Sequence, residues 1–173
     1  MLNVDFFETG VGPKVVLLHS SASSAGQWKS LMDCSSNKFN FIAINLIGYG
    51  KTRSWAGDKI QSLRDQVALI EKIPSLQNDN FSLVGHSFGG SVAMKAAVHF
   101  GERIDKLVLV EPNPFYLLDF EGRAEAFAEV LTLKNHIKSG LNNNWEKAVS
   151  FFADYWNGKG TWKSLSDVQK ERF

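Results

Sequence analysis

A candidate nucleophile lies in the segment Gly85-x-Ser87-x-Gly89, which follows an apolar run at 81–84 and precedes a run of small and apolar residues. A serine on a sharp strand-to-helix turn has a strained backbone and an exposed hydroxyl, and the flanking glycines leave room for the turn. The N–H groups of a helix that begins near Phe88 would favour an oxyanion beside this serine. The same three-residue pattern also occurs in flexible turns, so the strand before it and the helix after it support the assignment of Ser87 as a nucleophile.

A second motif suggests different chemistry. Gly50-Lys51-Thr52 resembles the end of a phosphate-binding P-loop, which would make the protein an NTPase. That loop needs a further glycine five residues before Gly50, where this sequence has Asn45. The nucleotide-binding interpretation is therefore not favoured, and we expect neither a cofactor nor a metal ion.

The elements around these motifs predict an α/β fold. Residues 2–8 and the apolar run 14–19 read as two strands joined by a turn at 9–13, which predicts an N-terminal antiparallel hairpin. Further strands are predicted at 39–46, 81–84 and 107–110, and helices at 27–34, 58–73 and 88–100. Alternation of strands and helices predicts a mostly parallel sheet with helices on both faces.

Candidate site residues all follow strands of this predicted sheet. Ser87, the Ser20-Ser21 loop, the loop at 48–50 and Glu111 come directly after predicted strands. Because the carboxyl ends of parallel strands meet at one edge of a sheet, we expect these residues to lie together.

Composition restricts the class of protein. The chain has 173 residues, 44% of them hydrophobic, and a net charge of +1, which predicts a globular fold without a nucleic-acid partner. Its single cysteine, Cys34, cannot form an internal disulfide, so we expect a cytoplasmic location. No signal peptide and no membrane span are predicted.

Residues 115–173 differ from the rest because they are helical in pattern and rich in aromatic side chains. Helices are predicted at 121–138 and 144–156, with a third short one that starts at Ser164 or Ser166 and reaches the last residue. The aromatic residues either pack between these helices or line an apolar substrate cleft. Trp28, Phe115 and Trp145 are the candidate substrate-binding residues.

Taken together, the motifs resemble the α/β-hydrolase superfamily, in particular its members with a helical cap. The matching segments are His19-Ser20-Ser21 for the oxyanion loop, 46–52 for the Gly-x-Gly loop, and 85–90 for the turn that carries the nucleophile. The resemblance implies a core at 1–114 and a cap at 115–173.

By this resemblance Ser87 is the nucleophile, and the backbone N–H groups of Ser21 and Phe88 bind the oxyanion. Ser20 stands where the family usually has glycine, a departure that affects the geometry of this loop. Glu111 occupies a position at which some members carry the acid of the triad, although it also reads as a polar residue at a strand end.

The family order of nucleophile, acid and histidine requires a histidine late in the chain. None of the four histidines, His19, His86, His99 and His136, has a sequence context that would orient it toward Ser87. We therefore expect an incomplete triad, and a chain that corresponds to the N-terminal part of a longer hydrolase and ends within the cap. The strand at 107–110 is then an unpaired sheet edge, which predicts self-association through that edge or through the cap.

The predicted function is that of a serine hydrolase that cleaves an ester or related acyl bond of a small apolar substrate through an acyl-enzyme. On its own, this chain is expected to be poorly active. One alternative is a catalytically silent ligand-binding or regulatory module, and another is an acyltransferase that uses the same serine.

Overall fold

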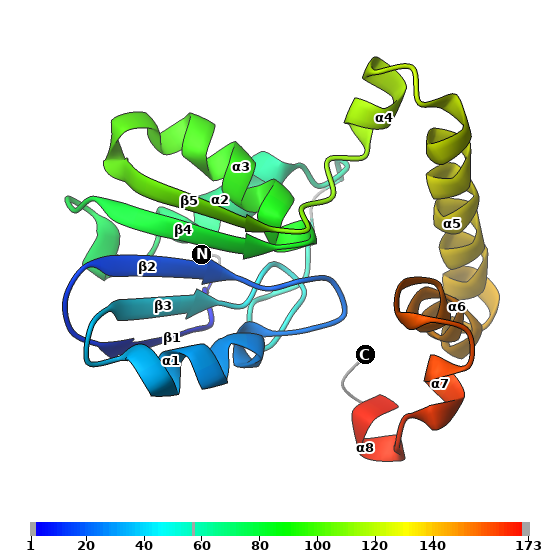
Figure 1. Cartoon of the computed structure of the whole chain (residues 1–173), viewed down its shortest axis with the longest axis horizontal. Coiled ribbons are helices and arrows are strands. Elements are labelled where there is room, and N and C mark those ends of the chain that lie inside the picture. Colours follow the sequence, from blue (N-terminus) through cyan, green and yellow to red (C-terminus); the bar gives the residue numbers. More distant parts are fainter. Residues whose placement is uncertain (1–2, 57, 171–173) are drawn as a thin grey trace. The chain divides into compact units, whose positions relative to one another are not determined.

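The structure is a computed structural model that describes residues 3–56 and 58–170. The chain divides into two compact units, Met1–Asn113 and Pro114–Phe173. Within the described residues, the first unit contains a five-stranded sheet with its helices, and the second unit contains helices alone (Figure 1).

The sheet of the first unit has the strand order β1-β3-β2-β4-β5. Its strands are β1 (Phe6–Gly10), β2 (Lys14–Leu18), β3 (Asn40–Ile44), β4 (Phe81–His86) and β5 (Ile104–Val110). Strands β2 to β5 run parallel, and β1 runs antiparallel to β3 (Figure 1). The predicted fold class, an α/β fold with a mostly parallel sheet and helices on both faces, is confirmed, and the sheet contains one antiparallel pair among the described residues.

The antiparallel pair differs from the predicted hairpin, because β1 pairs with β3 and not with β2. Gly10 of β1 and Lys14 of β2 both lie opposite Asn40, so the short connection between them crosses the start of β3. A Cβ atom on Gly10 would overlap the Phe39 carbonyl oxygen and lie 2.7 Å from that of Ser36, and Gly10 has a φ of +97°. Only glycine fits this close crossing.

Helices cover both faces of the sheet, as predicted. One face is covered by η1 (Ala25–Trp28) and α1 (Lys29–Ser35), and the other by α2 (Leu63–Ile70) and α3 (Phe88–Phe100). The short helices η2 (Pro74–Leu76) and η3 (Gly101–Arg103) precede β4 and β5.

Two apolar clusters follow from the alternation of side chains along the central strand β2. Val15 and Leu17 face the cluster that includes Met32 of α1, whereas Val16 and Leu18 face the cluster built with α2 and α3. Successive residues of a strand point to opposite faces, so a strand covered on both sides is apolar throughout. This explains why the run at 14–19 shows no alternation.

Helix α2 is shorter than the predicted helix at 58–73. It begins after Ser62, whose backbone N–H donates to the Asp65 carboxylate over 2.7 Å in a capping box. Ile60, which has the right spacing for the apolar stripe, is 95% exposed. The cap therefore sets the start of this helix, and the prediction from apolar periodicity placed that start too early in the chain.

Strand β5 is an edge of the sheet in the described part of the chain. Its side chains Leu107, Val108 and Val110 are 39%, 50% and 42% exposed. The predicted unpaired apolar edge is therefore present.

The second unit consists of α4 (Tyr116–Phe120), α5 (Ala124–Asn143), α6 (Trp145–Asn157), α7 (Thr161–Ser164) and α8 (Asp167–Lys170). The two long helices correspond to those predicted at 121–138 and 144–156, and α4 was not predicted. The predicted end of the third helix at the last residue lies outside the described residues.

Helices α5 and α6 pack closely against each other. A Cβ atom on Gly140 would lie 2.6 Å from the Cβ of Ala148, so glycine allows the approach. The Asn144 side chain caps α6 by accepting a hydrogen bond of 3.1 Å from the Lys147 N–H. Asn144 therefore fixes the start of α6 as its N-cap.

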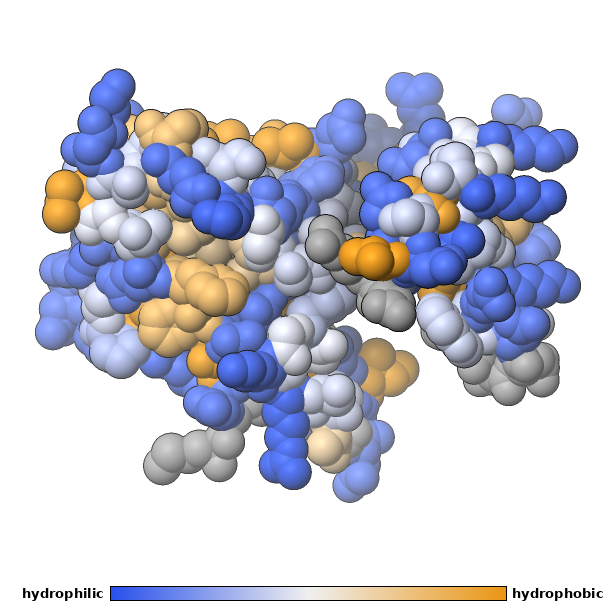
Figure 2. Space-filling view, turned by 90° about the horizontal axis from the view of Figure 1, so that it is seen from below, coloured by the Kyte–Doolittle hydropathy of each residue, from blue (hydrophilic) through white to orange (hydrophobic). Residues whose placement is uncertain are grey.

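Polar and apolar side chains are mixed on the surface. Figure 2 shows apolar side chains gathered on one face of the first unit. The large apolar residues that are exposed on β1 and α1 are Phe7 and Leu31. Among the described helices, none has both the length and the apolar character that crossing a bilayer requires.

Candidate active site

Ser87 occupies the turn between β4 and α3 with a strained backbone. Its φ and ψ are 52° and −115°, a conformation that residues other than glycine rarely adopt. The Ser87 N–H donates to the Val110 carbonyl oxygen of β5 over 2.9 Å, and its own carbonyl accepts from the Ser91 N–H over 3.1 Å. Contacts on both sides therefore hold the strained turn in place.

Both glycines of the motif are sterically required. A Cβ atom on Gly85 would lie 2.7 Å from the carbonyl carbon of Gly89, across the turn. One on Gly89 would overlap the Leu18 carbonyl oxygen and lie 2.5 Å from that of His19. The first turn of α3 therefore packs directly against the end of β2, which brings the loop after β2 beside the Ser87 turn.

His19 holds the loop after β2 in place through hydrogen bonds of its buried ring. Its side chain is fully buried, its Nε2 accepts a hydrogen bond of 3.1 Å from the Leu46 N–H, and its Nδ1 lies 2.7 Å from the Ser20 carbonyl oxygen. Because Nε2 accepts, the ring is neutral and Nδ1–H is the donor. Burial lowers the pKa of His19, partly opposed by its hydrogen bond to Ser20.

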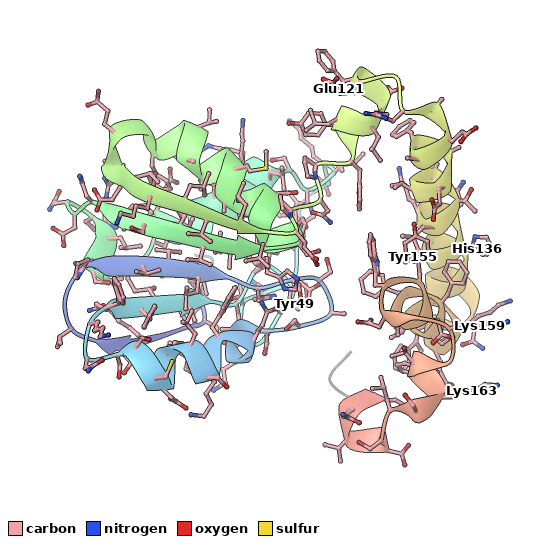
Figure 3. The ribbon with its side chains drawn as sticks, in the orientation of Figure 1. Tyr49, Glu121, His136, Tyr155, Lys159 and Lys163 are labelled. Atoms are coloured by element: carbon pink, nitrogen blue, oxygen red, sulfur yellow. The ribbon has the colours of Figure 1, made fainter. Side chains whose placement is uncertain are left out.

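The backbone N–H groups of this loop have different partners. The Ser20 N–H donates to Oε1 of Gln27 over 3.1 Å, and the Ala22 N–H donates to the Tyr49 hydroxyl over 3.3 Å. Figure 3 shows Tyr49 at the carboxyl ends of the parallel strands. Within residues 3–56 and 58–170, the N–H groups of Ser21 and Phe88 have no hydrogen-bond partner. The two amides predicted for an oxyanion hole are thus available to a ligand.

Glu111 follows β5 next to the Ser87 turn, and its φ of 43° marks a second strained position. Pro112 packs on α3, because a Cβ atom on Gly90 would lie 2.9 Å from it. The Ser91 hydroxyl donates to Oδ1 of Asn113 over 2.8 Å. The turn that carries Glu111 is therefore held against the helix that begins at the candidate nucleophile.

The histidines of the first unit are engaged elsewhere. His19 is buried under the loop, and Nδ1 of His86 lies 3.1 Å from Nε2 of Gln27. Nε2 of His99 contacts the Glu71 carboxylate over 2.7 Å near the end of α3. His136 belongs to the second unit (Figure 3). Its ring stacks on that of Phe151.

The candidate substrate-binding residues have different surroundings. Trp28 packs partly against the apolar cluster under α1, and its buried Nε1 has no partner among the described residues. In the second unit, Phe115 stacks on Trp156 with ring centroids 6.3 Å apart. Trp145, at the start of α6, is 58% exposed. Their role in binding stays a prediction.

Ser87 lines neither of two cavities formed by described residues of the first unit. One, of about 290 Å³, is lined by residues that include Glu71, His99 and Arg103. The other, of about 570 Å³, lies between β1 and the segment η1–α1, with Phe6 and Met32 in its wall.

Sequence reasoning missed several residues that build the site. Asn45, at the position where a P-loop would need glycine, accepts from the Ala25 N–H over 2.8 Å and donates to the Asp5 carboxylate over 2.8 Å. Asp5 also accepts from the Lys51 N–H, and the Thr52 hydroxyl donates to the Asn45 carbonyl. A polar residue at the end of an apolar strand was the available signal for Asn45, and Tyr49 lies in the loop at 48–50 that was predicted to be near the site, whereas Gln27 gave no signal.

Comparisons with known proteins show the family to which this fold belongs. A family model described as alpha/beta hydrolase fold matches residues 13–140. The pimeloyl-(acyl-carrier protein) methyl ester esterase of Nitrosomonas europaea is 31% identical over 117 residues, which are 68% of this chain and 44% of the relative. The 1-acylglycerol-3-phosphate O-acyltransferase of Arabidopsis thaliana is 30% identical over 161 residues, which are 84% of this chain and 35% of the relative.

Among solved structures, a hydrolase from Pseudomonas aeruginosa PA01 aligns with a TM-score of 0.73 and 17% identity, covering 98% of this chain and 60% of that one. The chain spans less than half the length of the two curated relatives. The family model covers well over half of this chain, and the observed sheet has the architecture that its description implies. The chain therefore belongs to the alpha/beta hydrolase fold family.

Proposed function

We propose that this chain carries the nucleophile and the oxyanion hole of a serine hydrolase that cleaves esters or related acyl bonds. Ser87 Oγ attacks the acyl carbonyl carbon, the alcohol leaves, and water then releases the acid from the acyl-enzyme. The N–H groups of Ser21 and Phe88 bind the oxyanion formed in each step. The observation that carries this proposal is the strained φ of Ser87 at the start of a helix that packs on the end of β2. Among the described residues, the Ser21 and Phe88 amides have no hydrogen-bond partner.

A small apolar ester or acyl compound is the proposed substrate class. The similar protein of Nitrosomonas europaea is named as a methyl ester esterase, which supports ester cleavage. Glu111 is the proposed acid of the triad, because it follows the strand that neighbours the Ser87 turn. A catalytic core at 1–114, a cap at 115–173 and a cytoplasmic location remain part of the same proposal.

A fluorophosphonate probe tests this function directly, because it reacts with activated serine hydroxyls. We expect covalent labelling at Ser87, mapped by tandem mass spectrometry, and complete loss of labelling in Ser87→Ala. Ser30→Ala, which changes an exposed serine of α1, serves as the matched control and should label like the unchanged chain. Labelling that persists in Ser87→Ala would contradict the assignment.

A catalytically silent binding module is the second candidate. It is favoured by the contacts of the first unit's histidines, which bind backbone groups, Gln27 or Glu71. For the same reason we expect this chain alone to hydrolyse activated esters slowly. Absence of probe labelling in a folded chain would favour the silent module over the hydrolase.

Acyl transfer is the third candidate, supported by the similar protein of Arabidopsis thaliana, which is named as an acyltransferase. It shares the acyl-enzyme with hydrolysis and differs only in that an alcohol replaces water as the acceptor. Product analysis in the presence of an added alcohol separates the two reactions.

We also propose that the chain self-associates through the edge strand β5. Exposed apolar side chains on an unpaired strand favour pairing with another strand. Light scattering should show association that increases with protein concentration, and Val108→Lys should weaken it by placing a charge on the edge. A strict monomer at high concentration would contradict this proposal, and Val98→Lys, which changes another exposed valine on α3, is the control.

A further inference from the structure

Gln27 links two parts of the candidate site that are far apart in the sequence. It lies in η1, where its Oε1 accepts hydrogen bonds from the Ser20 N–H over 3.1 Å and from the Ser20 hydroxyl over 3.0 Å. Its Nε2 lies 3.1 Å from Nδ1 of His86, the last residue of β4 before the Ser87 turn. These contacts of Gln27 with Ser20 and His86 are all partly buried. We call this set of contacts the Ser20–Gln27–His86 bridge.

The orientation of the Gln27 amide follows from the donors around it. A backbone N–H can only donate, so the Gln27 atom that faces the Ser20 N–H is the oxygen. The other end is then the NH₂ group, which can only donate, so Nδ1 of His86 must accept. The bridge therefore fixes neutral His86 with its proton on Nε2.

We propose that Gln27 is a positioning residue that holds the oxyanion loop in register with the nucleophile turn. This inference rests on the proposed hydrolase function, because it assigns the loop amide of Ser21 a role in catalysis. Gln27 binds the residue before Ser21 on one side and the residue before Ser87 on the other. The bridge thus connects the residue next to the candidate oxyanion amide with the residue next to the candidate nucleophile.

The bridge also explains the presence of Ser20 at a position where the alpha/beta hydrolase family usually has glycine. A glycine offers Gln27 only its N–H, whereas Ser20 offers the N–H and a hydroxyl to the same oxygen. Two bonds define the position of the loop better than one. The departure from the family pattern is therefore compensated by a partner six residues beyond Ser21 in the sequence.

The test combines two substitutions at Gln27 with a matched control. Gln27→Ala removes both sides of the bridge. Gln27→Glu keeps an oxygen for Ser20 but presents a second oxygen to His86, so the ring must then carry a proton on Nδ1. Gln77→Ala is the control, because Gln77 bonds the Glu71 carbonyl near the opposite end of α3.

The first readout is the rate of fluorophosphonate labelling at Ser87. Loss of one oxyanion donor typically lowers a rate by about 10²–10³, and a displaced donor costs part of this, so Gln27→Ala should label about 10-fold to 100-fold more slowly. Gln27→Glu should recover most of that rate, and Gln77→Ala should leave it unchanged. Labelling of Gln27→Ala at the unchanged rate would overturn the positioning role.

The second readout does not depend on activity. Nitrogen NMR of the full chain should show His86 with an unprotonated Nδ1, a mixture of tautomers in Gln27→Ala, and a protonated Nδ1 in Gln27→Glu. The Ser21 amide resonance should shift in Gln27→Ala. If the chain is never labelled at Ser87, the hydrolase proposal fails, and the bridge is then tested by these resonances alone. An unshifted Ser21 amide in Gln27→Ala, or a protonated Nδ1 of His86 in the unchanged chain, would overturn the bridge.

Discussion

Gly89→Ala is expected to destabilise the first unit by at least about 3 kcal/mol, the upper end of the usual cost of overpacking a closely packed site. The added Cβ atom would overlap the Leu18 carbonyl oxygen and lie 2.5 Å from that of His19. Both neighbours are backbone atoms, so no side-chain rotation relieves the overlap. Moving the end of β2 away would also move Ser20 and Ser21, and labelling at Ser87 should be lost.

Urea unfolding measures this effect, with Gly101→Ala as the control. Gly101 ends the same helix with a φ of +57°, and nothing lies within 4 Å of its added Cβ. The control should therefore lose only the backbone strain, about 1–3 kcal/mol, and it should still label. Equal stability losses and equal labelling in the two variants would contradict the close packing of α3 against β2.

His19→Leu is expected to cost at least about 2 kcal/mol at neutral pH. The buried Leu46 N–H loses the acceptor that Nε2 provides, and an unsatisfied buried donor costs about 1–3 kcal/mol. The Ser20 carbonyl loses its Nδ1–H donor as well. His136→Leu is the control, because His136 is exposed on α5 and leaves no buried N–H without a partner.

His19 also predicts a pH dependence of stability. Burial holds the pKa of His19 in the folded chain below its ordinary value of 6.5. Because the unfolded chain binds the proton first, this part of the stability is complete above pH 6.5 and is lost as the pH falls from there toward the folded pKa. The free energy of unfolding, measured in urea across this range, should fall less in His19→Leu than in the unchanged chain. A parallel fall in both would contradict a neutral, buried His19.

Local signals predicted the central part of the site from the sequence. The bounds of α3 and the turn at Ser87 follow from an apolar strand, two glycines and a run of small residues, all within one short segment. Strands β2 and β3, which are covered on both faces, were also predictable, because each is a continuous apolar run in the sequence. Each of these features depends on neighbours in the chain.

Features that depend on distant residues were not predictable. The pairing of β1 with β3 depends on how a short connection crosses Phe39, which no local pattern records. The contact of Gln27 with His86 joins residues 59 positions apart. Ile60 shows the reverse case, because its spacing fits the apolar stripe of α2, yet it lies before the cap and is exposed.

The most direct test is a crystal structure of the chain after reaction with a fluorophosphonate. The bound phosphoryl oxygen stands in for the oxyanion of an acyl intermediate. We predict a covalent bond from Ser87 Oγ to phosphorus, with that oxygen about 2.7–3.1 Å from the backbone nitrogens of both Ser21 and Phe88. A phosphoryl oxygen directed to solvent, or an adduct on any other residue, would contradict the assignment of this serine and these two amides.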